Sequence, residues 1–169
     1  DLKSANVHVN ALVDPTRPTT VKERFIADGN RTLLQVDKVD NREVSEETLG
    51  KLCKFVRDYD CNAVICSDFR HGIFNSETIS KITHAIPLGT IKVADSQVSN
   101  RWGNILDFAR FDLITPNERE TRFALGDQDT GIRPLAQKLY NRAECRYLIL
   151  KLGADGIITY RSPGIDVRE

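Results

Sequence analysis

The chain has 169 residues, 40% of them hydrophobic, and its 24 basic and 24 acidic residues give a formal net charge of zero. This length is enough for one domain with a buried core and too short for two large ones. Zero net charge argues against a nucleic-acid partner or an anionic membrane surface, and the apolar runs are far shorter than the roughly 20 residues that cross a bilayer, so we expect a soluble, cytoplasmic protein.

The first 41 residues predict a small β unit. Three stretches rich in apolar and β-branched residues are typical of strands: residues 7–13, 20–27 and 32–36. The turn residues at 28–30 predict a hairpin between the last two strands. Because charged side chains such as Lys22 and Arg24 interrupt the apolar ones, we expect a thin sheet with one solvated face, which suits a lid better than a core.

From residue 42 to residue 169 the pattern changes to alternating helices and strands. Apolar residues at helical spacing predict helices that begin near Ser45, Asn75 and Asn117, and a further helix around residues 132–139. Short apolar runs predict the strands: residues 63–66, 91–94, 111–114, 147–150 and 156–160. This alternation requires right-handed crossovers and therefore favours an α/β fold, a mainly parallel sheet with helices on both faces, to which residues 1–41 add a β lid.

The four cysteines lie within apolar patterns, at positions 53, 61, 66 and 145. No pair has the close spacing of a zinc site or a redox motif. We therefore expect buried thiols in a reducing compartment, and neither disulfides nor metal ligands.

Residues 112–120 are the most informative stretch of the chain. An apolar run ends there in a Pro-Asn turn, and a helix then begins with two carboxylates, Glu118 and Glu120. This order places Asn117 and both carboxylates at the edge of the sheet where open α/β folds bind ligands, which favours a phosphate or metal-phosphate site. An alternative stays open, because Asn117 and Glu120 also have the spacing of a helix capping box.

Polar residues follow four successive strands: Asp68, then Asp95, then Asn117 with Glu120, then Lys151 with Gly153. Parallel strands bring such ends together, and this combination of acids, an amide and a lysine suits magnesium and phosphates. Gly153 and Gly156 would let backbone amides approach an anion beside Lys151, although the same residues also fit a plain hairpin between two core strands.

Two other features have both a functional and a structural interpretation. Lys22 and Arg24 share one face of a predicted strand, where they would clamp a phosphate or simply be solvated. His71 follows a strand and is a candidate acid or base, although an exposed loop histidine usually does neither. The signatures Gly-x-Gly-x-x-Gly, Gly-x-x-x-x-Gly-Lys-Ser/Thr, His-Glu-x-x-His and Gly-x-Ser-x-Gly are absent, which argues against Rossmann dehydrogenases, P-loop enzymes, zincins and α/β-hydrolases.

Five motifs in a fixed order make the sequence resemble a known family. They are residues 19–24 (TTVKER), 66–72 (CSDFRHG), 93–96 (VADS), 115–120 (TPNERE) and 150–156 (LKLGADG). Together they resemble the ribokinase-like (PfkB) carbohydrate kinases, and most of all the heptose-7-phosphate kinase module of bacterial ADP-heptose synthesis enzymes. The resemblance covers nearly the whole chain.

The resemblance implies transfer of the terminal phosphoryl group of ATP to a sugar or sugar-phosphate hydroxyl, with magnesium, under a β lid that often forms a homodimer contact. It also implies roles by position. The nucleotide and magnesium-phosphate motif would be Asn117, Glu118, Arg119 and Glu120, with Glu120 as the metal ligand. Lys151 and Gly153 would line the ATP phosphates. The substrate-binding residues would be Lys22, Arg24, Asp68 and Asp95.

The sequence departs from the family in one respect. It contains neither the Gly-rich sugar-binding opening nor the Gly-Ala-Gly-Asp segment that supplies the catalytic base. We therefore expect residues 1–169 to be a piece of the fold truncated at both ends and inactive alone, because phosphoryl transfer depends on positioning and charge stabilisation. The alternatives are a non-catalytic module that binds a nucleotide or a partner, and a nucleoside or vitamin-precursor kinase of the same fold.

Overall fold

The computed structural model describes residues 2–29, 31–97 and 105–161. The strands are β1 (Val21–Ala27), β2 (Arg31–Lys38), β3 (Ala63–Asp68), β4 (Ile91–Ser96), β5 (Leu113–Ile114), β6 (Tyr147–Lys151) and β7 (Ile157–Arg161). The helices are α1 (Glu46–Asp58), α2 (Ser76–Ala85), α3 (Glu118–Leu125) and α4 (Ile132–Ala143), with short 3-10 turns η1 (Lys3–Ala5), η2 (Ile105–Phe108) and η3 (Gly153–Asp155). All helices and strands expected after residue 42 are present.

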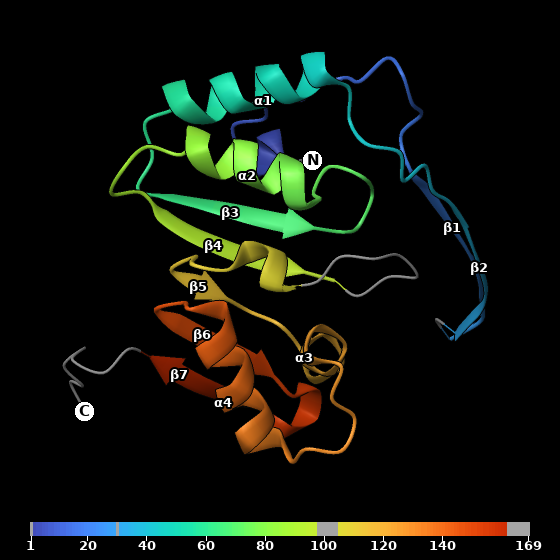
Figure 1. The fold of residues 1–169 in the computed structure, drawn as a ribbon. Helices are drawn as coiled ribbons and strands as arrows, with labels where there is room; N and C mark the ends of the chain where they lie inside the picture. The colour runs from blue at the N-terminus through green and yellow to red at the C-terminus, as the bar shows by residue number, and fades with distance from the viewer. Residues whose placement is uncertain (1, 30, 98–104, 162–169) are drawn as a thin grey trace.

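The central sheet has five strands in the order β3-β4-β5-β6-β7 (Figure 1). The first four run parallel, and β7 pairs antiparallel with β6. The mainly parallel sheet expected from the sequence is therefore confirmed. Because parallel strands point the same way, the carboxyl ends of β4, β5 and β6 share one edge of the sheet.

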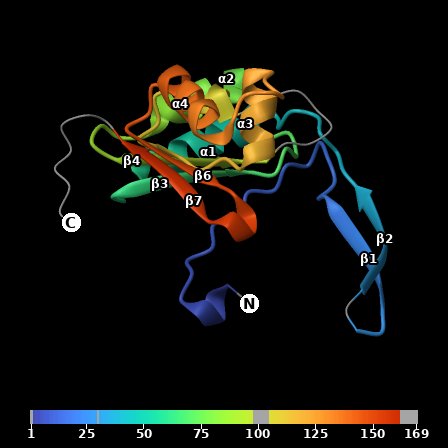
Figure 2. The same cartoon turned by 90° about the horizontal axis from the view of Figure 1, so that it is seen from below.

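Helices α2, α3 and α4 all lie over one face of the sheet, as Figure 2 shows. The spatial order of the strands follows the chain order, so each right-handed crossover places its helix on the same side. We expected helices on both faces, but that arrangement needs a reversal of strand order, and the described strands contain none. On the opposite face Ile65 and Ile157 are 68% and 60% exposed.

The core lies between the sheet and this helical layer. Its completely buried apolar residues come from both sides and include Ala94, Ile114, Leu148, Leu135 and Leu139. The buried ring of Phe108 makes edge contacts with Phe74 and Phe111, at centroid distances of 5.7 and 5.3 Å. Burial of each large apolar side chain is worth about 1.5–3 kcal/mol, so this layer holds the strand ends in place.

β1 and β2 form an antiparallel hairpin that projects away from the core, and we call it the lid (Figure 1). We expected one solvated face, but both faces are open, because every residue of β2 is exposed and in β1 only Ala27 is half-buried. The first of the three predicted strands, at residues 7–13, is wrong. Its apolar pattern is suitable, but no described segment pairs with it, and a strand needs a hydrogen-bonded neighbour.

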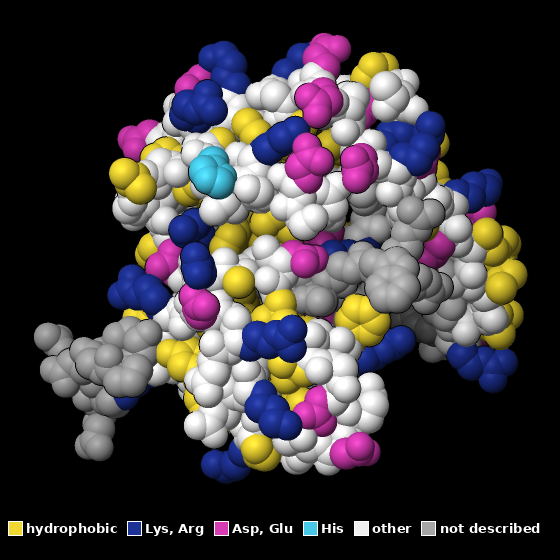
Figure 3. Space-filling view, viewed as in Figure 1, with side chains coloured by type: hydrophobic (Ala, Val, Ile, Leu, Met, Phe, Trp, Pro, Cys, Tyr) yellow, Lys and Arg dark blue, Asp and Glu magenta, His cyan; other side chains and the backbone are white. Residues whose placement is uncertain are grey.

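The cysteines are buried or half-buried, and none is in a disulfide. Cys66 and Cys145 are buried, Cys53 and Cys61 are half-buried, and all four are free thiols. Burial raises the pKa of the Cys66 thiol to about 11. None of the helices in the described residues is long and apolar enough to cross a membrane. Positive and negative side chains are interspersed on the face that Figure 3 shows.

Candidate active site

The start of α3 is held by a capping box. The backbone N–H of Glu120 donates to Oδ1 of Asn117 (2.8 Å), and the N–H of Asn117 donates to Oε2 of Glu120 (2.7 Å). The capping interpretation of these two residues is therefore confirmed. A cap and a ligand site are compatible here, because the cap fixes both side chains at the sheet edge.

β6 brings a lysine beside this cap. The N–H of Lys151 donates to the carbonyl of Pro116 (2.8 Å), and Lys151 pairs with Asn117 in an isolated parallel bridge. The Lys151 ammonium lies 2.6 Å from Oδ1 of Asp95, which also accepts a hydrogen bond from the Thr115 hydroxyl (2.9 Å). Side chains from the ends of β4, β5 and β6 therefore meet.

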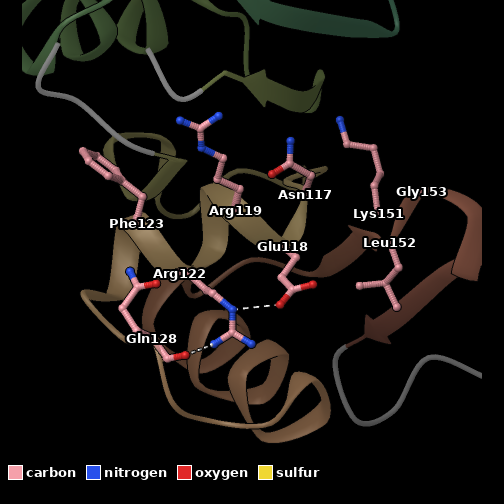
Figure 4. A pocket seen from close by; sticks show the side chains of 9 residues that line it. All are labelled: Asn117, Glu118, Arg119, Arg122, Phe123, Gln128, Lys151, Leu152 and Gly153. Atoms are coloured by element: carbon pink, nitrogen blue, oxygen red, sulfur yellow. Dashed lines mark hydrogen bonds and ion pairs between the residues drawn. The ribbon is translucent and has the colours of Figure 1, made fainter. Parts of the chain in front are cut away.

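Two adjoining cavities open at this meeting point. The smaller, of about 290 Å³, is lined by Asp95, Gln97, Asn117, Arg119, Glu120 and Lys151. The larger, of about 650 Å³, shares three of those residues and extends past Phe123 to Leu152 and Gly153 (Figure 4). We call the two cavities together the α3–β6 cleft. Seven of the ten predicted site residues line it: Asp95, Asn117, Glu118, Arg119, Glu120, Lys151 and Gly153.

The cleft side chains fall into two groups. Figure 4 shows Asn117, Arg119 and Lys151 pointing to the same side, whereas Glu118 points toward Arg122. Oε1 of Glu118 lies 2.8 Å from Nε of Arg122, whose Nη1 in turn donates to the backbone carbonyls of Gln128 and Thr130, both at 3.1 Å. Glu118 therefore supports the loop after α3, while the other three present polar groups to the cleft.

The oxygen donors of the cleft fit a magnesium ion. Mg²⁺ in kinase sites is usually held by one or two carboxylates together with water and phosphate oxygens. Asp95 and Glu120 supply two carboxylates on the smaller cavity. The described residues contain no group of three or more metal-ligating side chains, so a protein-only metal cage is not what this donor set offers.

Asp68 does not line either part of the cleft among the described residues, contrary to expectation. It is 2% exposed, and its Oδ2 lies 3.0 Å from Nε of the buried Arg70 and accepts from the Ser96 hydroxyl at 3.1 Å. A buried carboxylate needs such partners, because burying an unpaired charge is costly. The sequence pattern located this strand end correctly but could not show which neighbour neutralises the acid.

Lys22 and Arg24 line a separate cavity of about 820 Å³ between the lid and the core. We call it the lid cavity. Arg17 and His71 also line it; His71 was already a candidate acid or base, whereas no role was predicted for Arg17. Burial lowers the pKa of the His71 imidazole, and the positive charge of Lys22 lowers it further. Only the fold reveals Arg17, because it belongs to no chemical motif.

Curated relatives match most of this chain. A bifunctional protein HldE from Desulfatibacillum aliphaticivorans is 29% identical over 164 residues, which is 90% of this chain and 31% of the relative. The HldE of Caulobacter vibrioides is 30% identical over 132 residues, or 75% of this chain and 25% of the relative. The chain thus spans a third or less of the length of these relatives. No protein-family model matches it.

Solved sugar-kinase structures share the fold. Phosphofructokinase-2 from Escherichia coli, in complex with fructose-6-phosphate, superposes with a TM-score of 0.69 at 20% identity, over 96% of this chain and 55% of that one. Ribokinase from Giardia lamblia gives a TM-score of 0.70 at 12% identity, over 98% of this chain and 55% of that one. The chain therefore has the fold of the ribokinase-like carbohydrate kinases and resembles, over most of its length, one part of the bifunctional HldE proteins.

Proposed function

We propose that this chain is part of an ATP-dependent sugar kinase, in which the α3–β6 cleft binds the nucleotide phosphates and the lid cavity binds a sugar phosphate. The observation that supports this most is the meeting of Asp95, Asn117, Arg119, Glu120 and Lys151 at one sheet edge. Their cations, amide and acids match the needs of a magnesium-bound polyphosphate, and a cleft of this kind lies at the carboxyl end of the strands, as in other open α/β folds.

The cleft residues would contribute to phosphate binding in different ways. Lys151 and Arg119 place positive charge where a polyphosphate would lie, and charge-assisted hydrogen bonds from such groups are stronger than neutral ones. Asn117 and Glu120 are held still by the capping box, so little ordering is needed when ligand binds. A magnesium ion held by Glu120 or Asp95 would neutralise part of the phosphate charge.

The lid cavity favours an anionic acceptor. Arg17, Lys22 and Arg24 bring three cations to its wall. Its two acids are already engaged, since Asp14 accepts hydrogen bonds from Ser45 and Thr16, and Asp40 from Arg42. A phosphorylated sugar suits this wall better than a neutral sugar or nucleoside does. The HldE resemblance points to heptose 7-phosphate as the acceptor.

Calorimetric titration of the 169-residue chain tests the nucleotide half of this proposal. ATP with Mg²⁺ should bind more tightly than AMP with Mg²⁺, because the cleft recognises the polyphosphate. Equal affinities for the two nucleotides, or no binding of either, would contradict the assignment of the cleft.

A coupled assay for ADP release by the kinase of which this chain would be part, with heptose 7-phosphate as acceptor and free heptose as control, tests the reaction. Phosphorylation that prefers the 7-phosphate supports the full proposal. Binding of ATP without any transfer favours the alternative of a nucleotide-binding module.

We also propose that the lid mediates pairing with a second copy of the chain. Its exposed apolar side chains include Phe25, Ile26, Leu33 and Leu34, each more than half exposed. A two-stranded hairpin with both faces open is marginal in water and gains stability from a partner. Sedimentation of the wild type and of Phe25→Asp tests this, since a dimer that becomes a monomer supports it and a wild-type monomer at all concentrations contradicts it.

A further inference from the structure

The turn that follows β3, residues 68–72, contacts the α3–β6 cleft on one side. The N–H of Gln97, a residue of the cleft wall, donates to the carbonyl of Asp68 (3.0 Å). Nε of Arg70 donates to the carbonyl of Gln97 (3.0 Å) and pairs with the Asp68 carboxylate. Arg70 holds a left-handed backbone conformation (φ 59°), which a non-glycine residue adopts only when its surroundings compensate. The buried guanidinium provides that compensation.

We call the segments just before β1 and just after β2 the lid roots. The same turn contacts both of them on its other side. Nη1 of Arg17, just before β1, donates to the carbonyl of His71 (2.7 Å) and to the carbonyl of Arg42, just after β2 (2.6 Å). The N–H of Val44 donates to the carbonyl of Gly72 (3.2 Å). One guanidinium therefore joins both lid roots to the core turn.

Gly72 shows how close this approach is. Its φ of +83° suits glycine, and a Cβ added there would overlap the carbonyl oxygen of Arg42 and lie 2.9 Å from that of Asn41. The turn and the second lid root are therefore packed backbone against backbone. Glycine is the residue that permits such an approach.

We propose that Arg17 is a positioning residue that fixes the lid over the core, and that residues 68–72 transmit this placement to the α3–β6 cleft. We call this arrangement of Arg17 and residues 68–72 the clamp. Lys22 and Arg24 follow Arg17 by only a few residues, so the clamp determines where these two cations lie relative to the cleft. The catalytic consequence rests on the proposed function, because it is the acceptor hydroxyl and the nucleotide phosphates that the clamp would bring into register.

Distance measurement between the lid and the core tests the clamp without any ligand. Cys53 and Cys61 are replaced by Ser, and spin labels are attached at Asp28→Cys on the lid and Ser80→Cys on α2, while the buried Cys66 and Cys145 stay unlabelled. Arg17→Lys keeps the charge but loses the planar guanidinium. Arg110→Lys is the matched control, since its exposed ion pair with Glu144 joins neither cavity.

Arg17→Lys should broaden the distribution of label distances, and exchange of the Val44 amide should accelerate by about tenfold to a hundredfold, as expected when a charge-assisted hydrogen bond from the guanidinium is lost. Gly72→Ala, which separates the same surfaces from the turn side, should do likewise. Arg110→Lys should change neither quantity. Circular dichroism of each variant checks that the α/β core is folded.

The clamp is refuted if Arg17→Lys and Gly72→Ala both keep the wild-type distances and Val44 exchange, or if Arg110→Lys changes them equally. Neither readout needs nucleotide or sugar, so a failure of the proposed kinase function leaves this test intact. Where the chain or its parent protein is active, Arg17→Lys should lower kcat while the KM for ATP is unchanged, which a general loss of stability would not produce.

Discussion

The Lys151 ammonium and the Asp95 carboxylate lie 2.6 Å apart, although 56 positions separate them in the chain. They come from β6 and β4, and the short strand β5 lies between those strands in the sheet. Both side chains remain about 40% exposed, so the pair is open to a ligand and is worth little to stability on its own.

Replacement of the lysine should weaken nucleotide binding. Lys151→Met removes one charge-assisted contact, and we expect the affinity for ATP with Mg²⁺ to fall by about tenfold to a hundredfold, measured by calorimetry. Lys51→Met is the control, because its exposed ion pair with Glu47 lies on α1, away from the cleft. An unchanged affinity in Lys151→Met would remove Lys151 from the site.

Substitution of two asparagines that both cap helices distinguishes a capping role from a role in ligand binding. Asn117 caps α3 and Asn75 caps α2, each in a capping box. Asn117→Ala and Asn75→Ala should each lower the free energy of unfolding by about 1 kcal/mol in denaturant titrations. Only Asn117→Ala should also weaken ATP binding. If both variants bind ATP like the wild type, Asn117 is a cap alone.

Asp68→Asn should be strongly destabilising. It leaves the buried Arg70 guanidinium with only the more distant Asp107 carboxylate, 3.8 Å from Nη1, and breaking a buried ion pair from one side costs about 3–5 kcal/mol. Chemical denaturation measures this loss. A loss below about 1 kcal/mol, the level of an exposed pair, would show that Asp68 does not have the structural role inferred from its burial.

His71 should report on anions in the lid cavity. Burial and Lys22 lower the pKa of His71 below its ordinary value of 6.5, so protonation favours the unfolded chain and stability should fall as the pH drops below 6.5. A bound anion would raise this pKa. NMR titration of the imidazole in sulfate and in chloride of equal ionic strength measures the effect, with the exposed His84 on α2 as the control resonance. Identical His71 titrations in both salts would argue against an anion site.

Asp14 should make the stability depend on acid pH. A hydrogen bond from the backbone N–H of Ser45, with others from Thr16, lowers the pKa of Asp14 from 3.8 to about 2. A carboxylate whose pKa is lowered in the folded state stabilises the fold fully at pH values above its unfolded-state pKa. This stabilisation is lost as the pH falls through its folded-state pKa. Thermal unfolding of Asp14→Asn should therefore show a flatter decline between pH 4 and pH 2 than the wild type does. Parallel curves would contradict this assignment.

Much of the fold follows from local signals. The capping residues Ser45, Asn75 and Asn117 each begin a helix where the sequence predicts one. Caps and apolar periodicity act over one or two turns of chain, so they can be recognised without knowledge of the fold. The strand at residues 7–13 failed for the complementary reason, because a strand also requires a distant partner.

The candidate site was partly predictable from the same signals. A polar residue at the end of a parallel strand belongs to a known edge of the sheet, which is why Asp95, Asn117 and Lys151 were expected together. The same logic could not show that Asp68 is buried against Arg70, since burial and the choice of ion-pair partner depend on how neighbouring strands and loops pack.

Chain order and residue type were sufficient for the class of fold, the helix starts and the edge at which the cleft lies, since these depend on short-range periodicity and strand direction. The one-sided helical layer, the separate lid cavity and the contacts of Arg17 and Arg70 became evident only in three dimensions. They depend on which remote backbones approach closely enough to exclude water, and neither spacing nor composition encodes those distances directly.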